Sequence, residues 1–143
     1  MTSPAREEAR VREANRRFYQ AVENLSLEDL DAVWLPSAVC RCVHPGWPPV
    51  AGWEAIRDSW SRIFARTDNL EIALDQITVH IEGSVAWLNC LARVNSAGDA
   101  RLETALLSNS NLFILHEGDW RLVLHHASQL PDPMEASPTD LIQ

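Results

Sequence analysis

Apolar residues recur every three or four positions in two stretches of the chain, and this spacing predicts amphipathic helices. The first stretch contains Val11, Ala14, Phe18, Ala21, Val22 and Leu25. The second contains Ile56, Trp60, Ile63 and Phe64. The first helix is expected to start at Ser3 and Pro4, and the later one to open at Gly52.

The segment between these helices is expected to form a short helix, a short strand and a stiff loop. Ser26 is a suitable N-cap for a helix that runs to about Leu35, because Pro36 cannot continue it. Residues 38–43 are expected to form a strand. The loop at residues 44–49 contains three prolines, which should stiffen it.

From residue 70 onwards apolar and polar residues alternate, which indicates β-strands. Leu70, Ile72 and Leu74 share one phase of the alternation, and Ile77, Val79 and Ile81 share the other. This change of phase predicts a β-bulge near Asp75 or Gln76. Further strands are expected at residues 85–94, 102–116 and 120–129, joined by tight turns that each contain a glycine.

The order of these elements predicts an α+β domain in which helices cover one face of a long, bent, mostly antiparallel sheet. A bulged sheet curls, and helices across its concave side leave a cone that closes imperfectly and so contains a pocket. In the last strand, residues 122–124 are all apolar, which places this strand in the interior of the sheet. Side chains alternate along a strand, so His125 and His126 must point to opposite faces.

The length and net charge of the chain limit the number of domains and the kinds of partner that we expect. The 143 residues fit a single domain, expected at residues 1–130, followed by a proline-containing C-terminal tail at residues 131–143. A net charge of -8 argues against nucleic acid as a partner. The sequence has no apolar run of membrane-spanning length and no apolar core of a signal peptide, so we expect no membrane partner and a cytoplasmic location.

The cysteines and histidines do not have the spacing of a metal site. Cys40, Cys42 and Cys90 are interpreted as small core residues in a reducing compartment. Zinc needs at least three protein ligands, and neither a C-x-x-C nor an H-x-x-x-H spacing supplies them. We therefore expect no metal and no cofactor.

Three segments, in this order, resemble the nuclear transport factor 2-like (NTF2-like) superfamily and, within it, the SnoaL-like and DUF4440-type domains. They are residues 38–46 (AVCRCVHPG), 52–56 (GWEAI) and 120–128 (WRLVLHHAS). The resemblance covers roughly residues 14–130. It implies a cone-shaped fold with three N-terminal helices on the concave sheet face, and a homodimer. The superfamily contains isomerases, cyclases, dehydratases, ligand binders and assembly domains, so it does not fix a function.

Two members of this superfamily allow a comparison of single residues. His44 stands where ketosteroid isomerases carry the general-base aspartate before a proline. Their oxyanion-holding tyrosine falls at or next to Phe18, which cannot donate a hydrogen bond, and Tyr19 is expected to lie about 100 degrees further round the helix. Steroid isomerisation is therefore not expected. The closing strand is similar to that of the association domain of calmodulin-dependent protein kinase II, and this match places His125 and Ala127 on the pocket side.

His44 and His125 are the candidate catalytic residues. Histidine has a proton affinity near neutrality, so His44 beside a pocket can act as a general base that takes a proton from carbon or activates water. His125 or Asn111 would then hold the developing oxyanion. The alternatives are a rim histidine bonded to loop backbone for His44, and a core histidine with satisfied hydrogen bonds for His125.

Aromatic and amide side chains are the candidates for ligand contacts. The expected ligand-binding residues are Phe18, Trp47, Trp60, Phe64 and Asn111. Trp34 and Trp120 are expected to be ordinary core residues. Asn109 and Asn111 interrupt an otherwise apolar strand, so such polar residues should meet a ligand, water or a partner subunit.

Together these features favour a protein that binds a small apolar or aromatic molecule, as an isomerase-, cyclase- or hydrolase-type acid–base enzyme that uses His44. The alternative is a non-catalytic ligand-binding, dimerisation or assembly module. Apolar residues on both sides of the strands also predict that the convex sheet face is covered by a second copy of the chain, as a homodimer.

Overall fold

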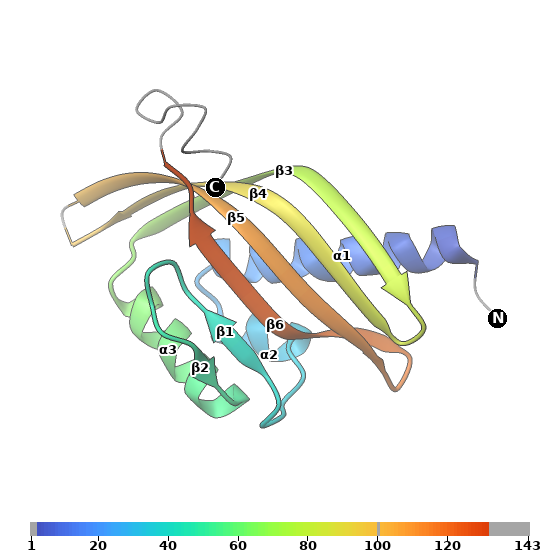
Figure 1. The fold of residues 1–143 in the computed structure, drawn as a ribbon. Helices are drawn as coiled ribbons and strands as arrows, with labels where there is room; N and C mark the ends of the chain where they lie inside the picture. The colour runs from blue at the N-terminus through green and yellow to red at the C-terminus, as the bar shows by residue number, and fades with distance from the viewer. Residues whose placement is uncertain (1–2, 100, 132–143) are drawn as a thin grey trace.

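The computed structural model describes residues 3–99 and 101–131, which form three helices and one six-stranded sheet (Figure 1). The helices are α1 (Pro4–Glu23), α2 (Leu27–Val33) and α3 (Trp53–Ala65). The strands are β1 (Arg41–Val43), β2 (Val50–Ala51), β3 (Asn69–Glu82), β4 (Val85–Gly98), β5 (Arg101–His116) and β6 (Asp119–Gln129). Their order is β2-β1-β6-β5-β4-β3, and every neighbouring pair is antiparallel except β1 and β6. The predicted tail lies outside the described residues from 132 onwards.

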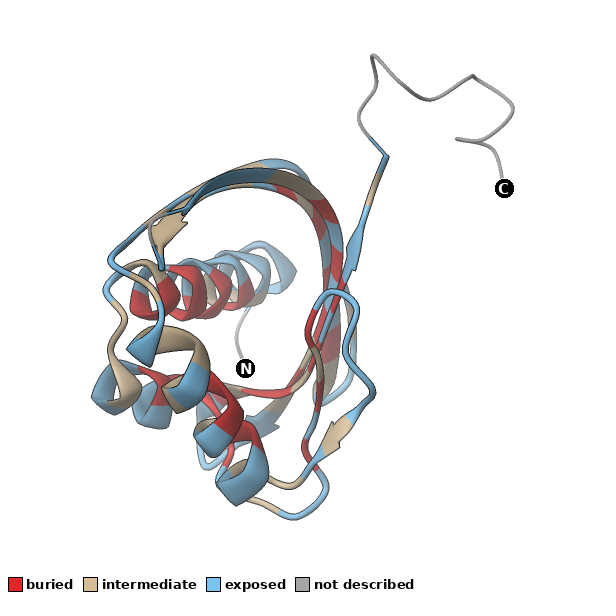
Figure 2. Ribbon diagram, turned by 90° about the vertical axis from the view of Figure 1, so that its left-hand side faces the viewer, coloured by how far each residue is buried: buried red, intermediate tan, exposed pale blue. Residues whose placement is uncertain are grey.

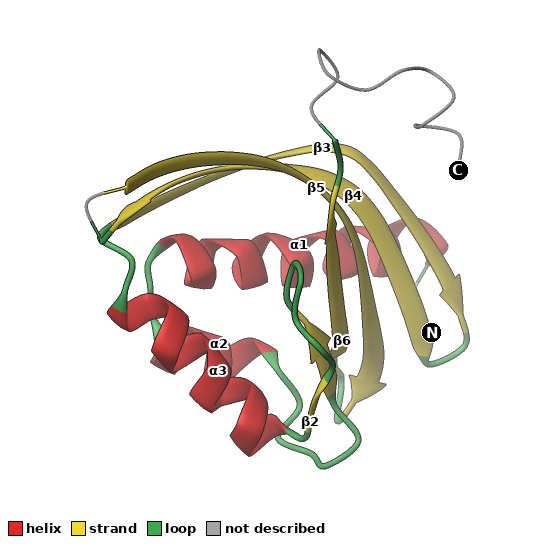
Figure 3. Ribbon diagram, turned by 60° about the vertical axis from the view of Figure 1, so that its left-hand side comes forward, coloured by secondary structure: helices red, strands yellow, loops and turns green. Residues whose placement is uncertain are grey.

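The sheet curls around α1, and the helices lie on its concave side (Figure 2, Figure 3). Buried residues line the inside of the curl, where α1 contributes Val11, Phe18 and Val22. The helix begins where the sequence places it, because the Ser3 hydroxyl accepts a hydrogen bond from the Arg6 backbone. The predicted α+β cone is thus confirmed. None of the helices in the described residues is both long and apolar enough to cross a membrane.

The predicted bulge in β3 is present. Asp75 pairs with Leu91 of β4. Thr78 forms the next pair, with Asn89, so β3 uses three residues where β4 uses two. Gln76 takes a positive φ of 51° at this point. The extra residue brings the apolar residues before and after it onto the same core, which is why their phase changes in the sequence.

A second bulge, in β6, decides which histidine faces inward. Phe113 of β5 pairs with Leu122 of β6. Asn111, two residues before Phe113, pairs with His125, which is three residues after Leu122. The extra residue in β6 reverses its alternation, so His125 is buried and His126 is exposed. An uninterrupted strand would turn His126 inward instead.

The apolar run at 122–124 therefore has two causes. As predicted, β6 lies in the interior of the sheet, between β1 and β5. In addition, Leu122 and Val123 are both buried, because Val123 is the extra residue of the bulge and successive side chains turn inward there. The sequence analysis identified the first cause and missed the second.

Two elements before the cavity-facing strands are shorter than predicted. β1 begins at Arg41 and not at residue 38, because the Ser37 hydroxyl accepts a hydrogen bond from the Val39 backbone and holds a turn there. α2 ends at Val33 and not near residue 35, because Trp34 becomes extended and pairs with β6 ahead of the proline at 36.

Large side chains fill the end of the cone nearest α2, which we call the closed end. It comprises Leu30, Val33, Trp34, Ala86, Leu88, Phe113, Trp120 and Leu122. Trp34 is fully buried and stacks on Trp53 with 5.4 Å between ring centroids, and Trp120 is also buried, so both are confirmed as core residues. Arg121 donates hydrogen bonds to the backbone oxygens of Ala32 (3.1 Å) and Trp34 (2.8 Å), which ties the end of α2 to β6.

Candidate functional site

Further along the same strands, the cone contains a cavity of about 330 Å³, which we call the open end. Its apolar and aromatic lining consists of Phe18, Tyr19, Val22, Pro45, Trp47, Trp60, Ile63, Leu70, Ile72, Ala92, Val94, Ala105, Leu107 and Ala127. Its polar lining consists of His44, Glu103, Asn109, His125 and Gln129. Three lining positions on β4, β5 and β6 carry alanine, whereas the closed end carries Leu88, Phe113 and Leu122 on these strands beside a single alanine, Ala86. The missing side-chain volume leaves the cavity open.

Most of the predicted site residues border this cavity, and two lie behind its wall. His44, His125, Phe18, Trp47 and Trp60 line it, brought together from α1, α3, β6 and the segment after β1. The two others take supporting positions. Phe64 packs behind Trp60, with 5.7 Å between ring centroids, and Asn111 lies next to His125.

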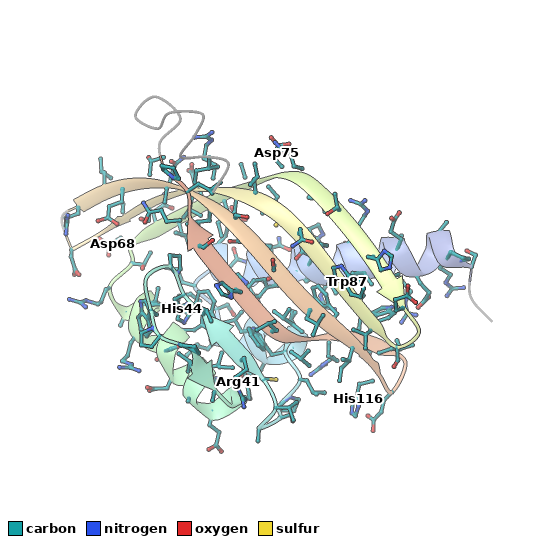
Figure 4. All side chains as sticks on the ribbon, in the orientation of Figure 1. Arg41, His44, Asp68, Asp75, Trp87 and His116 are labelled. Carbon is teal, nitrogen blue, oxygen red and sulfur yellow. The ribbon has the colours of Figure 1, made fainter. Side chains whose placement is uncertain are left out.

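His44 follows β1 and lies between β6 and α3 (Figure 4). It is buried, and its Nε2 is 2.8 Å from the Ser59 hydroxyl. The Ser59 hydroxyl donates its only proton to the backbone oxygen of Ile56 (2.6 Å), so it must accept from Nε2. The His44 proton is therefore held on Nε2, and Nδ1 carries the lone pair. The bonding partner is a helix serine and not the loop backbone that the alternative interpretation requires.

The surroundings of His44 keep it neutral. Its ring makes edge contacts with Trp60 (4.6 Å between centroids) and Trp47 (4.8 Å). Burial lowers the pKa of His44 from 6.5 to about 4. The Cys42 sulfur lies at similar distances from both ring nitrogens, 3.8 and 4.0 Å, and burial raises the pKa of this thiol to about 12. The thiol thus stays protonated and is not a nucleophile.

A buried amide holds His125 in one tautomer. The Asn111 amide nitrogen donates to Asn15 Oδ1 (2.8 Å) and to the Tyr19 hydroxyl (3.0 Å). Its oxygen is therefore the acceptor for His125 Nδ1, at 2.6 Å, and this nitrogen carries the imidazole proton. Burial, together with the nearby His44 and His126, lowers the pKa of His125 to about 3. His125 presents a neutral ring whose Nε2 can only accept.

Tyr19 is buried beside the cavity, a position that its predicted rotation from Phe18 did not indicate. Although it is one helical step from Phe18, both side chains are buried, because the curled sheet wraps around a wide arc of α1. The Tyr19 hydroxyl accepts hydrogen bonds from Asn109 (2.8 Å) and Asn111, and it lies 3.6 Å from the Cys90 sulfur. Burial raises the pKa of Tyr19, so the phenol stays neutral. Its role is to satisfy the two amides that interrupt β5.

These hydrogen bonds leave His125 and Asn111 without a free donor for the oxyanion that they were expected to hold. Neutral His125 has no N–H directed to the cavity, and the Asn111 amide hydrogens are already bonded. Two other lining residues have buried polar atoms without a hydrogen-bond partner within the described residues: Trp60 Nε1, a donor, and Asn109 Oδ1, an acceptor. The residues described here contain no group of three or more His, Cys, Asp or Glu side chains placed to hold a metal ion.

Sequence reasoning missed the polar residues that support the histidines. Ser59 is three residues after Ile56 and adjacent to Trp60, so the helical period already placed it on the buried side of α3. Asn15 is four residues after Val11 and is buried on α1 for the same reason. A polar residue at a buried helical position was the available signal.

Comparison with known proteins agrees with the family resemblance found in the sequence. The model of the family described as "SnoaL-like domain" matches residues 11–133. A candidate dehydratase of the NTF2-like family from Streptomyces avermitilis has a similar structure, with a TM-score of 0.85 and 30% sequence identity. That match covers 91% of this chain and 100% of the Streptomyces chain.

Two further similarities are more distant. A candidate association domain of calcium/calmodulin-dependent protein kinase type II from Thiobacillus denitrificans is 26% identical, with a TM-score of 0.74 over 82% of this chain and 93% of that chain. The F-box protein SKIP8 of Arabidopsis thaliana is 25% identical over 114 residues. This match covers 80% of this chain but 47% of SKIP8, so the chain spans about half the length of this curated relative.

Proposed function

Because this chain belongs to the SnoaL-like domain family of the NTF2-like superfamily, we propose that it binds a small, largely apolar molecule in the cavity and that His44 acts on this molecule as a general base. The observation that carries the proposal is the pairing of His44 with Ser59 at the wall of an aromatic cavity. A histidine with one nitrogen bonded and the other unprotonated has the form that proton abstraction requires.

The proposed chemistry is the transfer of a proton from a carbon next to a carbonyl group. The C–H bond breaks and the proton goes to Nδ1 of His44, while the Ser59 hydroxyl and the Ile56 carbonyl behind it stabilise the imidazolium through Nε2. The imidazolium then returns the proton to another carbon, which is isomerisation, or to a leaving hydroxyl, which releases water. The Nε1–H of Trp60, which has no partner within the described residues and whose ring contacts His44, is the donor proposed to meet the developing enolate oxygen.

The comparisons support this reaction class without assigning it. Loss of water is what the description of the Streptomyces protein implies for that protein. At 30% identity the fold carries over to this chain, whereas the substrate does not. The substrate class proposed here is accordingly broad: an apolar or aromatic ketone with a hydroxyl group or a double bond next to the carbon that loses the proton.

The test is turnover of a panel of aromatic β-hydroxy ketones, followed through the absorbance of the conjugated product. His44→Gln should lower turnover about 10²- to 10⁴-fold, the usual contribution of a general base, while the protein stays folded. His126→Gln, on the outer face, is the control. The wild-type rate should also fall as the pH drops through about 4, because protonated His44 cannot accept a proton. Unchanged turnover in His44→Gln would exclude the base.

A second candidate function is binding without chemistry. It is favoured by the low pKa values of both histidines, about 4 and about 3, since a general base is most effective with a pKa near the working pH. In this case a small molecule should co-purify with the protein and be identified by mass spectrometry, and no member of the panel should be turned over. His44→Gln should then change affinity only.

A further inference from the structure

The polar atoms that face the cavity are predominantly hydrogen-bond acceptors. The amide nitrogen of Asn109 is committed to the Tyr19 hydroxyl at 2.8 Å, and its oxygen is buried without a partner within the described residues. Asn109 itself is 2% exposed and lines the cavity. A buried amide oxygen left without a donor costs stability, and a ligand that supplies a donor recovers that cost.

His125 adds a second acceptor. Its Nδ1–H is fixed on Asn111, so Nε2 carries the lone pair, and in the part of the chain that the structure describes Nε2 makes no hydrogen bond. Both His125 and Asn109 line the cavity, and their strands place them close together, because Asn109 pairs with Ala127 and Asn111 with His125. Two side chains with unpaired acceptor atoms, Asn109 on β5 and His125 on β6, thus lie side by side in the lining of the cavity.

The lining also lacks a positive charge. No arginine or lysine is among the described residues that line the cavity, and the one charged residue there is Glu103. Both histidines are neutral at pH 7. A carboxylate placed in this cavity would lose its hydration, meet acceptor atoms and find no cation, and the single unpaired donor of Trp60 Nε1 could satisfy only one of its two oxygens.

We propose that the cavity selects a neutral aromatic or apolar molecule with a hydroxyl or N–H group, which Asn109 Oδ1 and His125 Nε2 hold, and that it rejects carboxylates of the same shape. This inference rests on the proposed small-molecule binding at the same site and specifies the chemical class of its ligand. It does not depend on whether His44 is catalytic.

The test uses three probes that share one methylated benzene ring: para-cresol, para-xylene and para-toluate. At about pH 7.5 the hydroxyl of para-cresol is neutral, like that of tyrosine, and para-toluate is an anion. Isothermal titration calorimetry should show that para-cresol binds at least about tenfold more tightly than para-xylene, since it satisfies a buried acceptor. Para-toluate should bind more weakly than both.

Variants locate the acceptor. Asn109→Leu should lose most of the preference for para-cresol over para-xylene, and Asn109→Asp, which keeps acceptor oxygens, should retain it. Asn89→Leu is the matched control, because Asn89 lies on the outer face of the sheet and bonds to Ser110. The wild-type ranking of the three probes tests the proposal even if a variant does not fold.

The outcomes separate this inference from the proposed function. Equal affinities for para-cresol and para-xylene, or tight binding of para-toluate, would overturn the selectivity and leave cavity binding intact. A preference for para-cresol that survives Asn109→Leu and is equally strong in Asn89→Leu would overturn the assignment to Asn109. Failure of all three probes to bind would overturn the proposed binding function and this inference together.

Discussion

The closed and open ends of the cone are built from the same strands and differ mainly in side-chain size. On β4, Ala86 and Leu88 pack at the closed end, and Ala92 lines the cavity. On β5, Phe113 fills the closed end, whereas Ala105 borders the cavity. At the closed end the indole of Trp34 completes the core, whereas at the open end the indoles of Trp47 and Trp60 border the cavity without filling it.

The two ends also differ in where they place buried polar groups. The two buried histidines, His44 and His125, and the amides of Asn109 and Asn111 gather at the open end or next to it. A filled core needs no polar partner, whereas each buried polar group needs one. The open end thus carries most of the buried polar side chains, although the closed end also contains one buried donor without a partner within the described residues, Trp34 Nε1. A concentration of buried polar groups is usual around a functional site.

The largest expected effect is a loss of folding stability at low pH, caused by the buried histidines at the open end. Burial lowers the folded-state pKa of His44 from 6.5 to about 4, so the unfolded chain binds more protons between these values. The stability contributed by neutral His44 is complete above pH 6.5 and is lost as the pH falls towards 4. The loss is about 3 kcal/mol for this residue, and His125 acts in the same direction.

Urea unfolding of the wild type and of His44→Gln between pH 7.5 and pH 4 measures this effect. The variant should show a shallower decrease in its free energy of unfolding over that range. His116→Gln, exposed at the end of β5, serves as the control and should follow the wild type. Identical profiles for His44→Gln and the wild type would show that His44 is not buried in its neutral form.

A smaller effect is expected from enlarging one alanine of β4 at the closed end and another beside the cavity. Ala86 and Ala92 are both fully buried on the same face of the strand. Ala86→Leu should lower the free energy of unfolding by about 1–3 kcal/mol, because the closed end has no space for it. Ala92→Leu should cost less than about 1 kcal/mol, since its side chain enters the cavity, and it should abolish binding of para-xylene.

Thermal or urea unfolding and calorimetric titration of this matched pair compare the two ends directly. Equal destabilisation by both substitutions would mean that the open end is as tightly filled as the closed end. Retained binding of para-xylene in Ala92→Leu would place the ligand elsewhere.

The smallest effect on stability is expected outside the cone. Trp87 is 39% exposed on the convex face and packs on His80, with 4.5 Å between ring centroids (Figure 4). The homodimer through this face remains a prediction. Trp87→Arg should change the free energy of unfolding of the isolated chain by less than about 0.5 kcal/mol. Sedimentation should nonetheless shift from dimer to monomer, and a wild type that sediments as a monomer would contradict the homodimer.

The bulge in β3 could be predicted from the sequence, whereas the bulge in β6 could not, for a physical reason. In β3, polar residues separate the apolar ones, so an extra residue visibly shifts the phase around Gln76. In β6, the extra residue falls within Leu122, Val123 and Leu124, where every position is apolar and no phase can be read. The inward position of His125 was expected from family resemblance, since periodicity does not provide it.

The other residues of the site also show which features can be predicted from the sequence and which depend on tertiary packing. The sequence identified His44, His125 and the aromatic lining, because these residue types stand out at the ends of predicted elements. It did not identify Tyr19 or Ser59, whose roles depend on how far the sheet wraps around α1 and on how α3 faces β1. Such angles arise from tertiary packing, and the helical period alone gives only the relative orientation of neighbours.

The unpaired residue Val123 lets β6 change length at the bulge without changing the wall of the cavity. Loss of that one codon would let β6 resume strict alternation with Leu122, His125 and Ala127 all still facing inward. Loss of the bulge with every residue retained would instead turn His126 and Ser128 inward, so the wall would gain a hydroxyl and lose the imidazole that Asn111 now holds. The bulge therefore decides which of two adjacent histidines a bound molecule would meet.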